Sequence, residues 1–508
     1  MIDWAVVVVA FAVIATAFAI ASASISRWRT PAKVATQPRS STVHRPPSTV
    51  HQIELPLLLL LAPLFLFSSP FSVLGVAAIL ALWVGRWLTQ GFFLPRTPLD
   101  WPLAIMCTMI PVGMLASPNM DWSVGRAGLI LYGVALYYAI VAWINSPARL
   151  EMATLAYLAA GSAMAALALL GTAWQYKVPV LGDIAQWFPQ VAHSLSRDST
   201  GFHPNIVAGA LLWVVLPLLA LFIEALSSRK DRNDANLSWY AAALRDLRVL
   251  GALLLLTGGT LVLTQSRGAL LGAAVGTGLI VYLYWPRLRP LVAAVGVVGV
   301  VVLGSLLVSW WNSRPAQYDS TTTPLSVYYD NFAVRMDIWK SALQGIREYP
   351  ITGVGLDAFR RVMPVRYPAP SVPESYDIGH AHNQFLQATL DLGLPGLVGY
   401  LALWLAAGLM LRRWTVDGGR WTARNHSSLV TRHSSLVTRH EPHPPSTVHR
   451  PPSIVIALAS ALLASFVHGL ADAVVMVSKP GVLFWAMLAI LVASWRLTGI
   501  KGDPTLQE

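Results

Sequence analysis

The residues best suited to chemistry lie in one short segment, His380–Gly396, where histidines, an amide and a carboxylate precede a hydrophobic stretch. His382 stands just before Asn383, where a helix is expected to begin. A neutral histidine can accept a proton near pH 7, so His382 is the candidate general base and His380 its supporting neighbour. A purely structural pair of hydrogen-bonded histidines is the alternative. Asp391 lies too far along the same helix to guarantee contact with His382.

A second polar group, Thr264–Gly268, forms the very short connection between two hydrophobic segments. Arg267 in this turn is either an arginine that snorkels to the membrane surface or a bidentate ligand for a phosphate or pyrophosphate. Ser266 and Gly268 would let the backbone approach such a ligand, and the following helix would direct its positive dipole end at it.

Two smaller constellations flank other hydrophobic segments. His203 and Asn205 stand at the start of one of them, where they form either a turn with a helix cap or part of a binding site. His468 and Asp472 are spaced i,i+4 in a segment that is otherwise apolar. Ionisable groups there are costly without a partner, so the two are expected to pair, in the simplest case with each other.

The composition indicates the scaffold that must position these residues. The chain has 508 residues, of which 55% are hydrophobic and only 12% charged, whereas soluble proteins average about 25% charged. The sequence therefore predicts an all-α polytopic membrane protein with about 12–13 transmembrane helices. The candidate spans are Trp4–Ser24, Leu55–Phe67, Phe71–Leu88, Trp101–Ala116, Gly125–Trp143, Leu150–Trp174, Ile206–Ala225, Val249–Leu263, Gly268–Tyr284, Leu291–Trp310, Leu394–Leu411, Ile454–Leu470 and Gly481–Ala493. Leu55–Phe67 contains Pro56 and Pro63, and a re-entrant or strongly distorted element is the alternative for it.

The distribution of basic residues predicts the orientation, because short basic loops stay in the cytoplasm. With the N-terminus outside, most of the 36 lysines and arginines fall on the cytoplasmic side and the long loop 311–393 is extracytoplasmic. Within this loop, Asn331–Glu348 has the periodicity of an amphipathic helix lying on the membrane surface. Its predicted apolar face comprises Phe332, Met336, Trp339, Leu343 and Ile346. Asp357–Val365 is expected to form a second short helix.

Two predicted cytoplasmic loops, 25–54 and 412–453, are of low complexity. Ser41–Ser48 recurs as Ser446–Ser453, and such segments are typical of disordered insertions, with a histidine-rich metal-binding tract as the alternative. The single cysteine, Cys107, excludes a disulfide within the chain and a cysteine-based zinc or haem motif. A net charge of +12 fits basic loops that contact acidic lipid or phosphate. No nucleic-acid-binding motif accompanies it, so no nucleic-acid partner is expected.

Taken in order, these motifs resemble the O-antigen ligase and O-antigen polymerase superfamily, which are bacterial polyprenyl-linked glycan transferases. The resemblance covers about residues 200–410, and a glutamate would be usual at the position of Asp391. The motifs that carry it are Gly201-Phe-His-Pro-Asn205, Ser266-Arg-Gly268, Arg335 before Ile338-Trp339, Pro350-Ile-Thr-Gly-Val-Gly355 with Phe359, His382-Asn383, and Asp391-Leu-Gly-Leu-Pro-Gly396.

The resemblance implies a GT-C-like helical membrane fold and transfer of a glycan from an undecaprenyl-diphosphate carrier to a hydroxyl acceptor, with inversion and without metal or cofactor. It implies His382 as the base and Arg267 and Arg335 as ligands of the diphosphate. The candidate binding residues are His203, Asn205, Ser266, His380 and Asn383. The domain organisation that follows is 1–199 N-terminal spans, 200–411 ligase-like core, 412–453 insertion and 454–508 C-terminal spans and tail.

The expected location is the bacterial inner membrane, with the active loop on the extracytoplasmic side. A polymerase of the same superfamily is the first alternative to a ligase. A transporter for a lipid-linked sugar is the second, although its expected internal repeat of spans is not seen in the sequence. A membrane-anchored assembly protein whose loop binds a partner is the third.

Overall fold

In the computed structural model, the residues described are 49–66, 72–195, 201–227, 239–311, 332–372, 377–430 and 453–497. Within these ranges the chain is helical, and its one β-type contact is an isolated bridge between Thr172 and Phe202. Among the helices of the described ranges, seven are long and apolar enough to cross a membrane, and further apolar helices are shorter. The predicted all-α polytopic membrane fold is confirmed.

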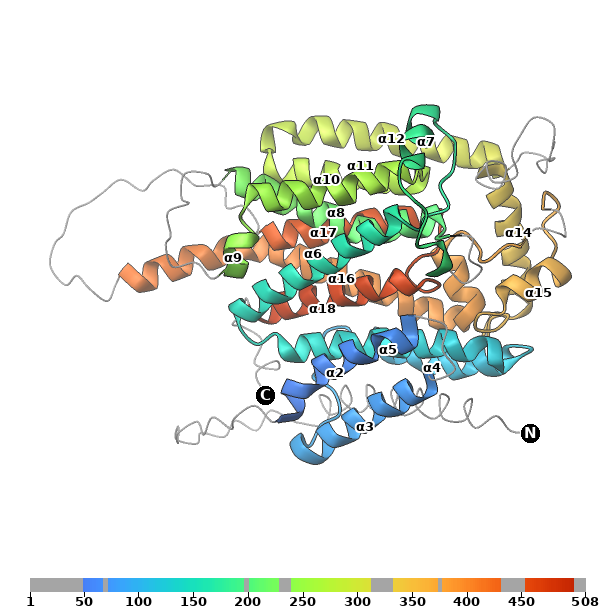
Figure 1. Cartoon of the computed structure of the whole chain (residues 1–508), viewed down its shortest axis with the longest axis horizontal. Helices are drawn as coiled ribbons and strands as arrows, with labels where there is room; N and C mark the ends of the chain where they lie inside the picture. The colour runs from blue at the N-terminus through green and yellow to red at the C-terminus, as the bar shows by residue number, and fades with distance from the viewer. Residues whose placement is uncertain are drawn as a thin grey trace.

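The helices run side by side as a bundle (Figure 1). The long ones are α2 Thr49–Leu66, α3 Ser72–Gln90, α4 Asp100–Ala116, α5 Met120–Trp143, α6 Pro147–Leu169, α8 Pro204–Ser227, α10 Leu247–Leu263, α11 Arg267–Tyr284, α12 Arg289–Trp311, α16 Gln384–Val430, α17 Ser453–Gly469 and α18 Val482–Leu497. Each candidate span from Leu55–Phe67 onward corresponds to one of them, and Trp4–Ser24 lies outside the described residues. Residues 55–66 belong to α2, a single helix that continues through Pro56 and Pro63.

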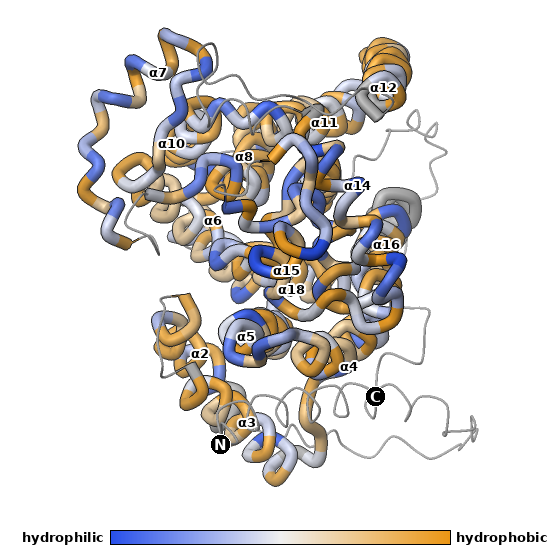
Figure 2. Tube along the Cα trace, turned by 90° about the vertical axis from the view of Figure 1, so that its right-hand side faces the viewer, coloured by the Kyte–Doolittle hydropathy of each residue, from blue (hydrophilic) through white to orange (hydrophobic). Residues whose placement is uncertain are grey.

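The centre of the bundle is formed by α17, which packs against α8 and α11, while α16 packs against α4 and α18 against α5. Hydrophobic residues dominate these helices (Figure 2). Hydrogen bonds between polar groups inside the bundle link neighbouring helices, which an apolar surrounding favours. The Tyr157 hydroxyl donates to the Trp213 carbonyl at 2.6 Å, and the Trp213 indole donates to the Ser465 hydroxyl at 2.9 Å. These bonds fix α6 and α17 to α8.

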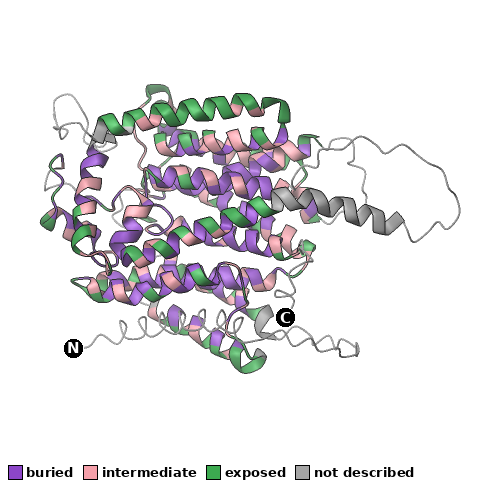
Figure 3. Cartoon of the chain, turned by 180° about the vertical axis from the view of Figure 1, so that it is seen from behind, coloured by how far each residue is buried: buried purple, intermediate pink, exposed green. Residues whose placement is uncertain are grey.

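Helix α12 is exposed along nearly its whole length (Figure 3). Its exposed side chains include Val295, Val298 and Val302. An apolar helix whose side chains face outward in this way is stable in hydrocarbon, where its backbone groups are satisfied internally and its side chains meet lipid.

The long loop of the sequence contributes two helices, α14 Phe332–Glu348 and α15 Phe359–Arg366, close to the predicted bounds. Helix α14 crosses one end of the bundle, which we call the α14 end (Figure 1). The prediction of a surface helix is corrected in one respect, because Val334, Arg335 and Ile338 are buried. Here α14 packs against α16. Of the predicted apolar face, Met336 is buried, whereas Trp339, Leu343 and Ile346 are partly buried. Tertiary contacts decide this packing, and the residues that make them are distant in sequence.

Helix α16 is kinked at Gly393, whose φ of 69° lies in the left-handed region. A Cβ atom at this position would lie 1.9 Å from the Ile351 carbonyl oxygen, so only glycine fits. Beyond the bundle α16 continues to Val430, into the segment 412–453 that was predicted to be disordered. No proline interrupts residues 396–441, so nothing in that stretch forces the helix to end. Residues 431–452, and 25–48 of the other insertion, lie outside the described residues.

Candidate functional site

Four connections between helices meet at the α14 end. They are the entry to α8 at Gly201–Asn205, the turn Thr264–Arg267, the segment His380–Asn383 before α16, and the segment Leu470–Gly481 after α17. The Asn383 side chain donates to the Leu470 carbonyl at 3.0 Å, which joins the last two connections. Gly268 lies against the same region, because a Cβ atom added to it would lie 3.5 Å from Cβ of Ala471. The structure therefore brings together motifs that are far apart in the sequence.

Asp472 lies at the centre of this cluster and is almost completely buried. Its Oδ1 atom is 3.6 Å from Nε2 of His380 and 3.8 Å from Nδ1 of His382, and its Oδ2 atom is 4.0 Å from the Arg335 guanidinium. Burial alone would raise the pKa of Asp472. The electrostatic interactions with His382, His380 and Arg335 outweigh that effect and hold the pKa of Asp472 well below its usual range. Asp472 is therefore an ionised carboxylate that faces both imidazoles.

The two histidines are stacked obliquely, with ring centroids 4.4 Å apart. The backbone N–H of His382 donates to Nδ1 of His380 at 3.2 Å, so the proton of neutral His380 is on Nε2, which faces Asp472. Burial, assisted by the neighbouring His382, lowers the pKa of His380 to about 3. His380 thus remains neutral, as a supporting neighbour should.

The backbone of His382 has a φ of 48°, in the left-handed region that non-glycine residues rarely adopt. Strain of this kind persists only where the surroundings impose it, and it is common at functional sites. The next residue, Asn383, caps α16 by accepting hydrogen bonds from the N–H groups of Phe385 at 2.9 Å and Leu386 at 3.1 Å. The prediction that a helix begins here is confirmed. Asn383, predicted to bind substrate, has both side-chain polar atoms bonded to the chain.

Arg335 is buried and its guanidinium donates to the Ala471 carbonyl beside Asp472. Arg267, by contrast, is exposed at the first residue of α11. The two arginines face a common neighbour, because both interact electrostatically with Lys177. Ser266 is buried and precedes Arg267 without capping the helix through its side chain. The N–H groups of the first turn of α11 and the two guanidinium groups form a positively charged end of the site.

The remaining sequence candidates occupy the entry to α8. His203 is exposed and its carbonyl accepts the N–H groups of Ile206 and Val207, both at 3.1 Å. Asn205 is buried in the first turn of the helix. The observed backbone role of His203 matches the turn and cap that the sequence offered as one of two interpretations.

His468 and Asp472 interact electrostatically, as expected, but Asp472 forms its ion pairs with other residues. Among the described residues, the ion pairs of Asp472 run to Arg335, His380 and His382. The His468 carbonyl accepts the N–H of Asp472 at 2.9 Å, and its ring lies between Gly209 and Gly268. The helix ends at Gly469, so an i,i+4 pairing that assumes a continuous helix does not apply.

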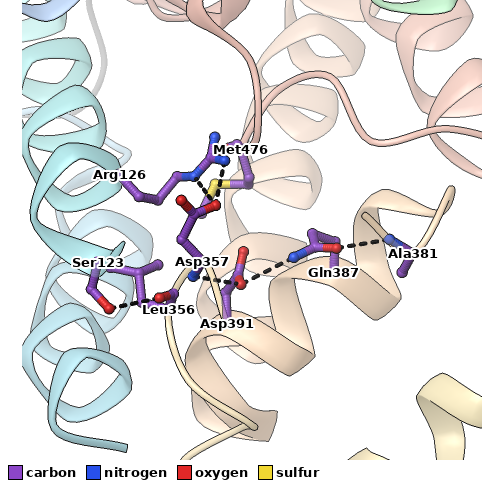
Figure 4. Close-up of polar contacts among 8 residues, drawn as sticks. All are labelled: Ser123, Arg126, Leu356, Asp357, Ala381, Gln387, Asp391 and Met476. Atoms are coloured by element: carbon purple, nitrogen blue, oxygen red, sulfur yellow. Dashed lines mark hydrogen bonds and ion pairs between the residues drawn. The ribbon is translucent and has the colours of Figure 1, made fainter. Parts of the chain in front are cut away.

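A hydrogen-bonded network connects the histidine segment to the bundle (Figure 4). The Ala381 N–H donates to Oε1 of Gln387 at 2.9 Å, and Nε2 of Gln387 donates to Asp391 at 3.0 Å. The same Asp391 oxygen accepts the N–H of Asp357 at 3.2 Å. Arg126 of α5 then donates to the Asp357 carboxylate at 2.6 Å and to the Met476 carbonyl at 3.2 Å.

This network gives Asp391 a position that the sequence could not assign. Gln387 holds the residue directly before His382, and Asp391 holds Gln387, so the carboxylate acts on the histidine segment through an amide. The turn Pro350–Gly355 closes over the same helix, because Val354 N donates to the Leu390 carbonyl at 2.8 Å and Leu394 N donates to the Pro350 carbonyl at 2.7 Å.

The ligand atoms of His380, His382 and Asp472 all lie within 4.8 Å of one another, a spacing that could hold a metal ion. Two positive groups oppose a cation here, because Arg335 lies 4.0 Å from Asp472 and Lys177 interacts with the same carboxylate. The electrostatics favour an anionic ligand beside this cluster over a divalent cation.

Two residues of the site were not among the candidates from sequence. Asp472 was noted only as the expected partner of His468, and Lys177 was not noted at all. An ionisable residue in an apolar segment was the available signal for Asp472. No local sequence pattern marked Lys177 as a site residue, because its place in the site depends on the fold.

Comparison with known proteins identifies part of this chain. Residues 252–401 match the family described as O-antigen ligase. A Haemophilus influenzae (strain ATCC 51907 / DSM 11121 / KW20 / Rd) protein described as uncharacterized is 26% identical over 152 residues, which are 28% of this chain and 37% of that protein. The chain thus spans well under half the length of that relative. The matched family segment contains Arg267, Arg335 and His382, whereas Lys177, His203 and Asp472 lie outside it.

Proposed function

We infer from the O-antigen ligase domain at residues 252–401 that this chain is a membrane glycosyltransferase, which transfers a glycan from a lipid-linked diphosphate to a hydroxyl acceptor. The observation that carries this proposal is the cluster at the α14 end, where Asp472 lies 3.8 Å from His382 and 4.0 Å from Arg335. A base and a cation held by one carboxylate are what the transfer of a glycan from a diphosphate requires.

The proposed donor is a glycan linked to undecaprenyl diphosphate. Its diphosphate is already a good leaving group, so the protein must supply positive charge at the departing oxygen. Arg335 and Arg267 supply that charge, and the planar guanidinium can bind two phosphate oxygens at once. Ser266 and the N–H groups at the start of α11 contribute further donors, while His203 and Asn205 line the entry to α8.

His382 is the proposed general base. Its Nδ1 atom faces Asp472 at 3.8 Å, which favours the tautomer with the proton on Nδ1. Nε2 then has the free lone pair that accepts the proton of the acceptor hydroxyl. Asp472 stabilises the imidazolium that results. His380 is neutral and therefore adds no second positive charge beside it.

The reaction proceeds in one displacement. The acceptor oxygen attacks the anomeric carbon, the bond from that carbon to the diphosphate oxygen breaks, and its electron pair leaves with the diphosphate. The hydroxyl proton moves to Nε2 of His382. This displacement inverts the anomeric centre and requires no metal or cofactor, because the arginines take the charge-stabilising role.

The proposed location is the bacterial inner membrane, with the α14 end on the extracytoplasmic side and a GT-C-like arrangement of helices. The ligase-like unit would comprise residues 200–411 together with Asp472 from the C-terminal spans. The acceptor decides between the two members of the superfamily. A lipid core or a protein as acceptor makes the chain a ligase, and a second glycan repeat makes it a polymerase.

The test uses the full chain purified and reconstituted in liposomes with an undecaprenyl-diphosphate-linked glycan. We expect release of undecaprenyl diphosphate that depends on an added hydroxyl acceptor. Movement of intact donor across the bilayer without release would instead support a transporter. In a deletion strain, loss of all attached surface glycan would identify a ligase, and retention of single repeat units would identify a polymerase.

A further inference from the structure

The loop between α6 and α8 forms a wall of the site. Its two ends are held together by backbone hydrogen bonds, from Ala173 N to the Phe202 carbonyl at 3.0 Å and from Phe202 N to the Gly171 carbonyl at 2.6 Å. Phe202 directly precedes His203, so the base of the loop stands beside the entry to α8. Within the loop, the short helix α7 Pro179–Gln186 packs against α10.

The side chain of Gln265 fixes the first part of this loop over the α10–α11 turn. Its Oε1 atom accepts the N–H groups of Lys177 at 2.9 Å and Val178 at 2.7 Å, and its Nε2 atom donates to the Gln175 carbonyl at 2.7 Å. Gln265 is buried and has a φ of 55°, in the left-handed region. Three hydrogen bonds from this one buried amide hold the loop segment in place.

The segment held by Gln265 directs Lys177 inward. Tyr176 and Val178, its neighbours on either side, are 53% and 47% exposed. Tyr176 packs against α7, where its hydroxyl donates to Asp183 at 2.6 Å. Lys177 lies between these outward-facing residues and its Nζ atom is buried. The alternation of an extended segment explains why this one side chain enters the site.

Three charged residues from three different elements interact electrostatically with Lys177. Arg267 of α11 and Arg335 of α14 repel it, and Asp472, after α17, attracts it. With a single carboxylate among three cations, the cluster has an excess of positive charge. Like charges brought together in a buried place cost free energy unless an anion is bound among them.

We propose that Lys177 is a third cationic ligand of the diphosphate in the lipid-linked donor, and that Gln265 is the residue that positions it. This inference rests on the proposed function, because it assigns a further binding residue to the same substrate. Lys177 extends the positively charged end of the site from the two arginines to the loop between α6 and α8. The lysine is suited to this role because its ammonium group is a compact charge with three donors.

The protonation of Lys177 supports the assignment. Burial, followed by the charges of Arg267 and Arg335, lowers its pKa to about 8. The charge of Lys177 therefore depends on the groups around it, and a bound diphosphate would stabilise the protonated form. Loss of one charge-assisted hydrogen bond to a phosphate weakens binding by about tenfold or more.

The test measures binding of undecaprenyl diphosphate to the full chain in nanodiscs of neutral lipid. The variants are Lys177→Gln, Lys177→Arg and Gln265→Ala. The matched control is Lys340→Gln, which alters a lysine that pairs with Asp337 at 3.5 Å on α14. We expect about tenfold weaker binding for Lys177→Gln and Gln265→Ala, wild-type binding for Lys340→Gln, and substantial rescue by Lys177→Arg.

Further arms identify the source of the phosphate. Inorganic pyrophosphate tests whether the diphosphate alone is recognised, and nanodiscs that contain phosphatidylglycerol test a general preference for anionic headgroups. Weaker binding to pyrophosphate and undecaprenyl diphosphate in Lys177→Gln, with unchanged binding of phosphatidylglycerol, supports the proposal. An effect confined to phosphatidylglycerol overturns it.

The remaining outcomes separate this inference from the proposed function. Wild-type affinity of a folded Lys177→Gln variant for the donor, with weakened binding by Arg335→Ala, overturns the role of Lys177 and leaves the transferase standing. In that case Lys177 is a counter-ion of Asp472. Absence of any binding of undecaprenyl diphosphate by the wild-type chain overturns both. If Lys177→Gln does not fold, the affinity of Lys177→Arg and Gln265→Ala decides.

Discussion

Nδ1 of His382 lies 3.8 Å from the carboxylate of Asp472, although the segment 412–453 separates the two residues in the sequence. In the proposed mechanism, the carboxylate favours the tautomer of His382 with the proton on Nδ1, which leaves Nε2 to accept a proton. Asp472→Asn should therefore lower the rate of transfer by about 10²- to 10⁴-fold while the affinity for the donor changes little. Turnover and KM measured on reconstituted protein check this expectation.

Asp377→Asn is the matched control for that substitution, because Asp377 forms an exposed ion pair with Arg360. The control should keep wild-type turnover. Equal turnover of Asp472→Asn and wild type would show that the carboxylate has no part in proton transfer.

The network in Figure 4 makes a second prediction, which concerns positioning. Gln387→Ala removes the acceptor of the Ala381 N–H and the donor to Asp391. Leaving such buried groups without partners costs about 1–3 kcal/mol, and the segment that holds His382 should lose its orientation. We expect a lower kcat with an unchanged KM for the donor, and a pH profile of kcat that shifts relative to wild type.

Gln344→Ala, at an exposed position of α14, is the control. A kcat of Gln387→Ala equal to that of this control, in a folded protein, would contradict the positioning role. A loss of thermal stability alone would indicate that Gln387 only supports the fold.

The sequence allowed the helices to be predicted, but not the contacts between residues of different helices and loops. The lengths of the hydrophobic segments predicted the described spans, and periodicity predicted α14 and α15 close to their observed bounds. The signal for Asp472 was read as a local i,i+4 pair because a continuous helix was assumed, whereas α17 ends at Gly469. The position of Lys177 could not be predicted, since it follows from the hydrogen bonds of Gln265 to a loop far away in the sequence.

A third prediction concerns pH. The pKa of Lys177 is lowered to about 8 by burial first and then by Arg267 and Arg335, against the opposing effect of Asp472. Lys177 carries its charge below that pH and loses it above, so affinity for undecaprenyl diphosphate should fall as the pH rises from about 7 to about 9. Lys177→Arg should flatten this fall, because arginine stays protonated throughout. An equal fall in both proteins would assign the pH dependence to another group.

A fourth prediction concerns metal ions. His380, His382 and Asp472 have the spacing of a metal site, but Arg335 and Lys177 oppose a cation there. Transfer should therefore continue at full rate after dialysis against EDTA. Loss of activity on chelation, restored by a divalent ion and abolished by His380→Gln, would show that the cluster is a metal centre and not a proton-transfer pair.

The most direct test of the proposed base is transfer by His382→Ala, compared with His193→Ala as the matched control. His193 lies in the loop between α6 and α8, where its ring is 3.3 Å from the Thr172 carbonyl oxygen. Both variants are purified, reconstituted and supplied with the lipid-linked donor and acceptor. The mechanism predicts that His382→Ala inserts and binds donor like the wild type but transfers no glycan, while His193→Ala remains active. Wild-type transfer by His382→Ala would contradict the assignment of His382 as the general base.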